Sequence, residues 1–450
     1  MLLRNKIPKA FKKKMKSYKN SEFEKNIILT KTERISILGE NADKNILVIG
    51  CAGSYKTRGY VKSNLMQMQG SYVCNDCHDE VLKDCGKMLL DNGYKIKTLN
   101  VRKFEKSMHY NPFVYIRKKE DIYKLVDTIM LNTKGKENCF VHAEEFYYTA
   151  LIGYIWYECV EEEQNFSTLL DMIEASEVRE DDEEFKNPVD LMFEELEQQS
   201  PKHFAVEQYR KYKFAAGRTA KNVIISCAAR LQLFYIPEIR KLTNYDELEL
   251  DKVWDEKTAL FVSFPDSNNE YDLIVAMMYS QILSISYDKT KNDCNEKPQE
   301  HVHFLIDDFP CIGKIPNYKI LITKKRGITI SMLAQSLLKI SDYYKDIVLD
   351  YCDIILFYGL AHCYQDSVLI HKLFDESINK HLRETDIEKY KWKVEHAYMF
   401  FNMEKNKVVF LSKKYNVKKH KQYKFLAEYD EKNTFHIEDV LNKNKDVAFR

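Results

Sequence analysis

The stretch NILVIGCAGSYKTRGYVKSN, residues 45–64, places an apolar strand, a small-residue turn and a helix in direct succession. The apolar run NILVIG is typical of a strand buried in a parallel sheet. The turn fits the phosphate-loop pattern G-x-x-x-x-G-K-[ST] at Gly50, Lys56 and Thr57, but Tyr55 stands where the second glycine is expected. Two interpretations remain open at this point: a phosphate-binding loop, or a strand–turn–helix that binds no ligand.

The chemistry of such a loop explains why the tyrosine matters. Backbone N–H groups of the turn and the start of the helix point at a bound phosphate. Lys56 would reach the β- and γ-phosphates, and the Thr57 hydroxyl would help to hold Mg²⁺. The position before the lysine is usually glycine because the backbone takes unusual angles there and comes close to the ligand. Tyr55 would therefore be strained or would cover the pocket.

The rest of the chain alternates strands and helices around one long helical interruption. Strand patterns at 70–76 and 94–101 flank a helix over 80–93, an order that predicts a parallel sheet with crossover helices. Helical patterns replace strands from about 120 to 250, and strand patterns return at 258–264, 301–308, 328–335 and 352–359. We therefore predict an α/β domain with a mostly parallel central sheet, interrupted by an all-α insertion. The expected boundaries are a basic tail over 1–26, the α/β domain over 27–120 and 251–425, the insertion over 121–250, and a tail over 426–450.

Composition and charge place the chain on the cytoplasmic side of a membrane. The formal net charge is only +1, but residues 1–19 are basic and residues 158–200 are strongly acidic. No stretch approaches the roughly 18 apolar residues of a spanning helix, and no signal peptide opens the sequence. The 11 cysteines are therefore expected to be reduced thiols. Residues 4–19 have nearly helical apolar spacing among lysines, which suits peripheral contact with an anionic membrane; the alternative is a solvated tail.

A second segment, HVHFLIDDFPCIG (301–313), has the form of a Walker B motif: an apolar strand that ends in two acids. In that motif the first acid, here Asp307, holds the Mg²⁺ and its water shell. The second acid is usually glutamate and polarises the attacking water; Asp308 is one methylene shorter and reaches less far. If both motifs are real, we expect the loop near 50–57 and the acids at 307–308 to meet at the carboxyl edges of neighbouring parallel strands.

With these motifs in hand, residues 27–425 resemble the type IV secretion coupling proteins, in the form found in mobile elements of Gram-positive bacteria. The resemblance extends to YNPFVYIR (110–117), AAGRTAKNVIISCAARL (215–231) and FLIDDFPCIGKIPNY (304–318). It implies a RecA-like P-loop ATPase with an all-α insertion, using ATP and Mg²⁺ and assembling as a homohexamer at the inner face of the bacterial membrane. It also implies delivery of a relaxase with its single-stranded DNA to the type IV secretion channel.

The same resemblance assigns roles to individual residues. The nucleotide would be bound by Gly50, Gly53, Ser54, Tyr55, Lys56, Thr57 and Arg58, and the metal by Thr57 and Asp307. The catalytic group would comprise Asp308, Gln335 as the γ-phosphate sensor, and Arg326 acting across a subunit interface. Phosphoryl transfer depends on positioning and charge neutralisation, so these groups must converge on one nucleotide.

Several features depart from the family pattern. Besides Tyr55 and Asp308, the segment CNDCHDE (74–80) replaces a TDPKGE-like strand end, and the two usual N-terminal membrane helices are missing. Two functions follow as hypotheses: a DNA-translocating ATPase, or a weakly active or inactive paralogue that serves as a protein-binding adaptor or regulator of conjugative transfer. An unrelated soluble P-loop regulator is a third.

Two histidine and cysteine patterns allow alternative interpretations. Cys74-Asn75-Asp76-Cys77-His78 spells the C-x-x-C-H string of haem attachment, and with Cys85 it could form a zinc site; reduced cysteines at a strand end are the simpler interpretation. His301 and His303 alternate on one strand, either as ligands or as hydrogen-bonded strand residues.

Overall fold

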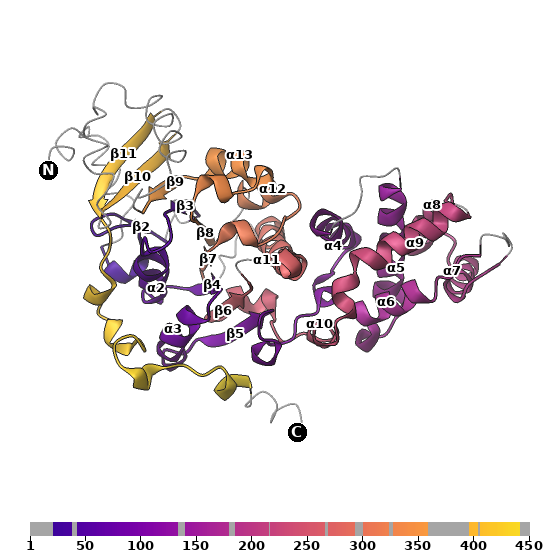
Figure 1. The fold of residues 1–450 in the computed structure, drawn as a ribbon, viewed down its shortest axis with the longest axis horizontal. Helices are drawn as coiled ribbons and strands as arrows, with labels where there is room; N and C mark the ends of the chain where they lie inside the picture. Colours follow the sequence, from indigo (N-terminus) through magenta and orange to yellow (C-terminus); the bar gives the residue numbers. More distant parts are fainter. Residues whose placement is uncertain are drawn as a thin grey trace.

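The computed structural model describes residues 21–37, 43–133, 140–179, 185–215, 217–265, 269–292, 300–323, 327–358, 396–403 and 406–441. These residues form an α/β domain and a group of helices beside it (Figure 1), and one apolar core extends through both. The α/β domain contains the phosphate-loop sequence, so its sheet decides which residues can gather there.

In the described part of the chain the α/β domain is built on a sheet of nine strands. From one edge to the other they are β11 (Asn406–Lys413), β10 (His396–Met403), β9 (Ile354–Phe357), β3 (Asn45–Ile49), β8 (Ile328–Ala334), β7 (Val302–Ile306), β4 (Ser71–Asn75), β6 (Thr258–Ser263) and β5 (Lys95–Asn100). The strands from β9 to β5 are parallel, whereas β10 pairs antiparallel with both β9 and β11. The predicted parallel sheet is confirmed; the antiparallel hairpin at its edge was not predicted.

Alternation along β3 shows how the sheet is covered on both faces. Leu47 and Ile49 belong to one apolar core, and Ile46 and Val48 belong to the other. The first core contains α11 (Asp272–Asn292), α12 (Tyr318–Thr323) and α13 (Asp342–Tyr351); the second contains α2 (Lys62–Leu65) and α3 (Glu80–Asp91). A strand buried on both faces favours apolar residues on both, which is why residues 46–49 form a continuous apolar run.

Two smaller pieces pack against the second core. The strands β1 (Asn26–Ile28) and β2 (Arg34–Ser36) form an antiparallel pair beside α2. The C-terminal segment, residues 414–441, then runs past α2 and along α3 (Figure 1). Its side chains Leu426, Phe435 and Ile437 are buried, and Gly86 of α3 leaves the space that the Phe435 ring fills.

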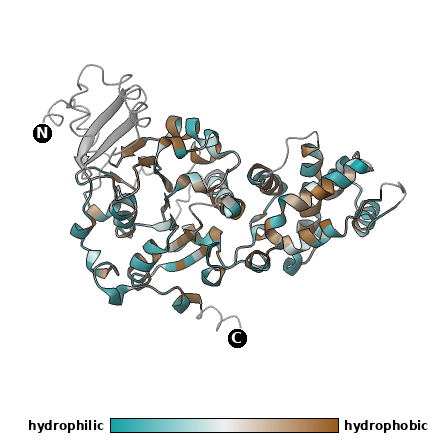
Figure 2. Cartoon of the chain, in the orientation of Figure 1, coloured by the Kyte–Doolittle hydropathy of each residue, from teal (hydrophilic) through white to brown (hydrophobic). Residues whose placement is uncertain are grey.

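The second domain is a bundle of helices, as the sequence predicted. Its members are α4 (Lys119–Asn132), α5 (Val141–Glu158), α6 (Phe166–Glu174), α7 (Pro188–Gln199), α8 (Phe204–Tyr212), α9 (Arg218–Arg230) and α10 (Pro237–Leu242). Helix α5 packs against α4, α6, α8 and α9, and in Figure 2 it carries apolar residues where α7, on the outside, is polar. The buried carboxylate of Glu144 on α5 pairs with the buried guanidinium of Arg230 on α9 at 2.7 Å.

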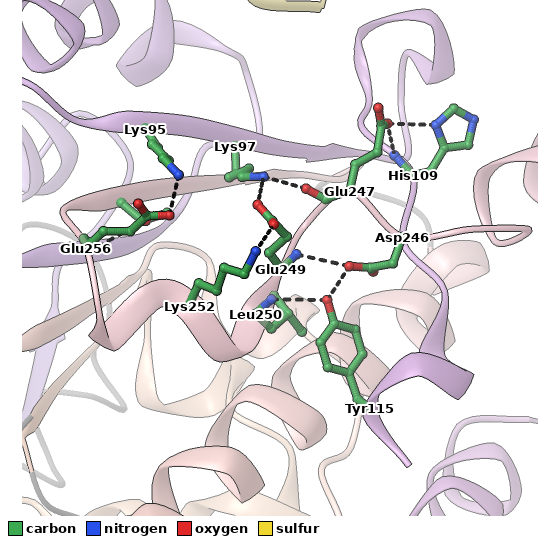
Figure 3. Close-up of polar contacts among 11 residues, drawn as sticks. Lys95, Lys97, His109, Tyr115, Asp246, Glu247, Glu249, Leu250, Lys252 and Glu256 are labelled. Atoms are coloured by element: carbon green, nitrogen blue, oxygen red, sulfur yellow. Dashed lines mark hydrogen bonds and ion pairs between the residues drawn. The ribbon is translucent and has the colours of Figure 1, made fainter. Parts of the chain in front are cut away.

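A polar network ties together the two chain segments that join the domains (Figure 3). Lys97 on β5 donates to the Glu247 carbonyl at 2.6 Å and to the Glu249 carboxylate at 2.7 Å. The Tyr115 hydroxyl donates to Asp246 at 2.6 Å and accepts from the Leu250 amide at 3.1 Å. The segment that leads into the helical domain and the segment that leads back to the sheet are therefore hydrogen-bonded to each other, and this pairing holds the connection between the two domains in place.

Candidate functional site

The phosphate-loop sequence forms a tight turn between β3 and a π-helical turn, η3 (Thr57–Val61). The Gly50 amide donates to the Ala334 carbonyl at the end of β8, at 3.1 Å, and the Ser54 amide donates to the Cys51 carbonyl at 3.1 Å. A Cβ at position 50 would lie 2.8 Å from the Tyr358 carbonyl oxygen, so only glycine fits there. The loop is thus anchored to the end of β8 and packs closely against the end of β9, the two strands on either side of β3.

Tyr55 takes the backbone conformation that the missing glycine would have taken. Its φ is +68°, in the left-handed region, and its side chain is 53% exposed. Its carbonyl accepts from the Gly59 amide at 2.7 Å. A left-handed conformation costs a non-glycine residue about 1–2 kcal/mol. The departure from the pattern is therefore tolerated as local strain, and the loop keeps its shape.

Lys56 points back into the loop and is almost fully buried. Its ammonium donates to the Gly50 carbonyl and to the Cys51 carbonyl, the latter at 3.3 Å. Burial lowers the pKa of this lysine, and the nearby charges of Asp307 and Asp308 oppose that shift. A buried cation among carbonyl oxygens and two carboxylates is suited to an anionic ligand, because a polyphosphate would stabilise its charged form.

The two motifs meet, although 250 residues separate them: the Thr57 hydroxyl donates to the Asp307 carboxylate. Asp307 is buried, and burial, followed by the charge of Asp308, raises its pKa. A hydroxyl and a carboxylate in contact are oxygen donors of the kind that Mg²⁺ takes, so these two residues fit the metal. Asp308 follows with φ +50° and is half-buried. The expectation that β3 and β7 are neighbours is wrong, because β8 lies between them.

The intervening strand brings Gln335 to the same edge. It directly follows β8, and its side-chain oxygen accepts from the Lys339 ammonium at 2.6 Å. Arg58, predicted to bind nucleotide, forms an ion pair with Glu428 in the C-terminal segment. Gly53 takes φ +71° with open space around the position of a Cβ. Arg326 lies outside the described residues, as do residues 4–19.

Sequence reasoning missed Lys414, which follows β11. Its ammonium donates to the Ser54 carbonyl at 2.6 Å and to the Tyr358 carbonyl at 3.2 Å. It also lines a cavity of about 710 Å³ beside the loop, whose described lining includes Lys31, Tyr55 and Arg58 and no acidic side chain. A contact between residues 360 positions apart leaves no local pattern, so no signal in the sequence pointed to it.

The cysteine and histidine patterns have structural explanations. In the residues that the structure describes, no three Cys, His, Asp or Glu side chains gather as a metal would require, so the zinc alternative is not supported. Cys74, Cys77 and Cys85 are buried, and burial raises the pKa of each thiol. His301 and His303 form hydrogen bonds to Thr329 and Ser331 on β8, at 3.0 and 2.8 Å. None of the described helices is both long and apolar enough to cross a bilayer.

Comparisons with known proteins agree with this geometry. The chain superposes on the conjugative coupling protein TrwBΔN70 in its unbound monoclinic form with a TM-score of 0.63 at 14% identity, covering 91% of this chain and 92% of that one. TrwB in complex with the non-hydrolysable ATP analogue ADPNP gives 0.61 at 13% identity, covering 91% and 92%; the complex with the GTP analogue GDPNP gives 0.62 at 14%, covering 91% and 93%. These likenesses establish a shared fold, an α/β RecA-like domain with a helical insertion.

Sequence comparisons add the family. A search of curated proteins found no match. The model of the family described as type IV secretory system conjugative DNA transfer matches residues 6–348, which is most of the chain. With the fold, the phosphate loop and the paired acids on one sheet edge, this match shows that the chain belongs to the type IV secretory system conjugative DNA transfer family, the coupling proteins.

Proposed function

We propose that the chain binds ATP with Mg²⁺ at the loop between β3 and η3. The observation that carries this proposal is the hydrogen bond between Thr57 and Asp307, which unites the loop with the acidic strand end. Lys56 lies beside them and is held away from bulk water. TrwB, which has the same fold, forms complexes with the nucleotide analogues ADPNP and GDPNP, and this supports the proposal.

The residues of the site divide the work of ATP hydrolysis among them. Lys56 would leave the carbonyls of its own loop and neutralise the β- and γ-phosphates. Thr57 and Asp307 would hold the metal, which when bound draws charge from the phosphate oxygens. Asp308 would orient the attacking water, and Gln335, on the strand between the two motifs, would contact the γ-phosphate. Each group comes from the carboxyl end of a strand in one sheet, where ligands of open α/β sheets bind.

We propose that ATP turnover drives delivery of relaxase-bound single-stranded DNA to a type IV secretion channel. The family membership supports a role in conjugative DNA transfer. By the same resemblance the working form would be a homohexamer at the inner face of the cell membrane, with Arg326 completing the site of a neighbouring subunit. The basic amphipathic spacing of residues 4–19 would let them touch anionic lipid.

A second function is favoured by three features of the site. Asp308 is shorter than the usual glutamate and sits in a left-handed conformation, and Lys56 is satisfied by carbonyls of its own loop. These features suit a protein that holds nucleotide but turns it over slowly and acts as an adaptor in conjugative transfer.

The experiment that tests these proposals measures ATP affinity and turnover in the purified chain with and without Mg²⁺. We expect Lys56→Ala to weaken ATP binding by at least about tenfold, because one charge-assisted contact is worth roughly 1.5–3 kcal/mol. Lys432→Ala, which removes an exposed lysine of the C-terminal segment, is the matched control and should bind as the unaltered protein does. If the short side chain of Asp308 limits ATP turnover because it cannot reach the attacking water, Asp308→Glu should raise the turnover rate.

Each outcome decides between the hypotheses. Failure of the unaltered chain to bind ATP in Mg²⁺ would refute nucleotide binding. Binding with negligible turnover in both the unaltered chain and Asp308→Glu would refute the motor and leave the adaptor. DNA-stimulated turnover would support the motor.

A further inference from the structure

Lys414, which lies late in the sequence, connects two parts of the α/β domain: the phosphate loop and the end of β9. It lies just after the edge strand β11, and its ammonium bonds to the Ser54 carbonyl in the phosphate loop and to the Tyr358 carbonyl at the end of β9. The same ammonium sits 5.1 Å above the centre of the Tyr358 ring. One side chain therefore bridges the loop and the sheet.

The bridge acts on the peptide group that sets the conformation of Tyr55. The Ser54 carbonyl belongs to the peptide whose nitrogen is that of Tyr55, so its orientation is coupled to the φ of +68°. On the other side, the Tyr55 carbonyl is held by the Gly59 amide at 2.7 Å. Both peptide groups around the strained residue are thus fixed by hydrogen bonds. A non-glycine residue stays in a sparsely populated backbone region only when its surroundings determine it in this way.

We propose that Lys414 is a positioning residue of the phosphate loop, which holds the peptide between Ser54 and Tyr55 so that a tyrosine can take the conformation of a glycine. The consequence for ligand binding rests on the proposed function, because a loop that leaves this conformation no longer presents its amides to a phosphate. The effect on loop conformation does not depend on any ligand.

The position of Lys414 separates this role from a purely electrostatic one. Lys56 and Cys51 face it from the loop, Tyr358 from the end of β9, and Arg58 lines the same cavity. Burial, aided by the charge of Lys56, lowers the pKa of Lys414 to about 8. Because burial disfavours the charged form of Lys414, this side chain is not well suited to a purely electrostatic role. Its hydrogen bonds to two carbonyl oxygens instead give it a role in positioning the backbone.

Amide hydrogen exchange in the peptide covering residues 50–60 tests the proposal without any ligand. Lys414→Met should speed exchange of the Ser54 and Gly59 amides by about tenfold, since the strained conformation is released. Lys414→Arg keeps donors that reach both carbonyls and should stay within about twofold of the unaltered chain. Lys432→Met removes an exposed lysine from the same segment, outside the cavity beside the loop, and should leave the exchange rates unchanged. Exchange in β4 and α3 reports whether the fold itself is intact.

The same substitution made in a Tyr55→Gly background gives the decisive comparison. Glycine needs no support at this φ, so Lys414→Met should then speed loop exchange by less than about threefold. Equal acceleration in both backgrounds, or none in either, would overturn the proposal. ATP affinity should follow the same pattern, with a fall of about tenfold for Lys414→Met alone. If loop exchange behaves as expected but no variant binds ATP, the positioning role stands and the proposed nucleotide binding fails.

Discussion

Replacing Tyr55 by alanine and, separately, by glycine measures the strain in the phosphate loop. Both variants lose the half-exposed ring, so they differ only in the Cβ at φ +68°. At most positions glycine is less stable than alanine by about 0.5–1 kcal/mol, because its unfolded chain has more freedom. In the left-handed region the Cβ costs about 1–2 kcal/mol. The usual order should therefore reverse, with Tyr55→Gly more stable than Tyr55→Ala by about 0.5–1 kcal/mol.

Urea unfolding of the two variants side by side provides the assay. Gly53→Ala is the companion control: Gly53 has φ +71° and open space around the position of a Cβ, so the added methyl meets only the backbone penalty. Gly53→Ala should lower the free energy of unfolding by about 0.5–1 kcal/mol. This loss equals the stability that Tyr55→Gly is expected to have over Tyr55→Ala. If Tyr55→Ala proves as stable as Tyr55→Gly, while Gly53→Ala behaves as expected, then Tyr55 does not hold the left-handed conformation and the reasoning fails.

Three further predictions concern other residues. Gly50→Ala places a Cβ 2.8 Å from the Tyr358 carbonyl, and thermal unfolding with ATP titration should show a loss of about 1–3 kcal/mol and of ATP binding; normal binding would contradict the tight fit. Burial lowers the pKa of His420 to about 4, so the unfolded chain takes up a proton before the folded chain does as the pH falls from about 6.5 to 4. Urea unfolding should therefore show a loss of about 2 kcal/mol in the free energy of unfolding over that pH range. His420→Gln should remove this pH dependence. Glu144→Gln leaves the buried Arg230 without its counter-charge and should destabilise the helical domain by about 3–5 kcal/mol in the same assay, whereas a loss below about 1 kcal/mol would show that the pair is not buried as described.

The sequence was sufficient for the elements whose signal is local. A strand covered on both faces is mostly apolar, which made β3 and β7 recognisable, and the turn after β3 carries its own residue pattern. The pairing of Thr57 with Asp307 could be expected because carboxyl ends of parallel strands share one edge of a sheet.

The order of the strands and the contacts of the C-terminal segment could not be predicted. Strand order depends on which two strands each connecting segment joins, so the sequences of β3 and β7 do not indicate that β8 lies between them. Lys414 and Glu428 act on the loop from about 360 and 370 positions away, and isolated charged residues in a basic region carry no sign of their partners. Tyr55 was judged from local backbone preference alone, which the surrounding hydrogen bonds outweigh.

The C-terminal segment also determines which shortened forms of the protein can be handled. Residues 426–437 run along α3: two of their amides donate to the Lys83 and Asp84 carbonyls, the Phe435 ring fills the space over Gly86, and Phe435 and Ile437 belong to the apolar core on this side of the sheet. A chain that ended at residue 413 would expose that side of α3 to solvent and would lose the ion pair between Arg58 and Glu428. Exposed apolar surface of this kind drives self-association, so a truncated α/β domain prepared for biochemistry should precipitate where the longer chain stays in solution.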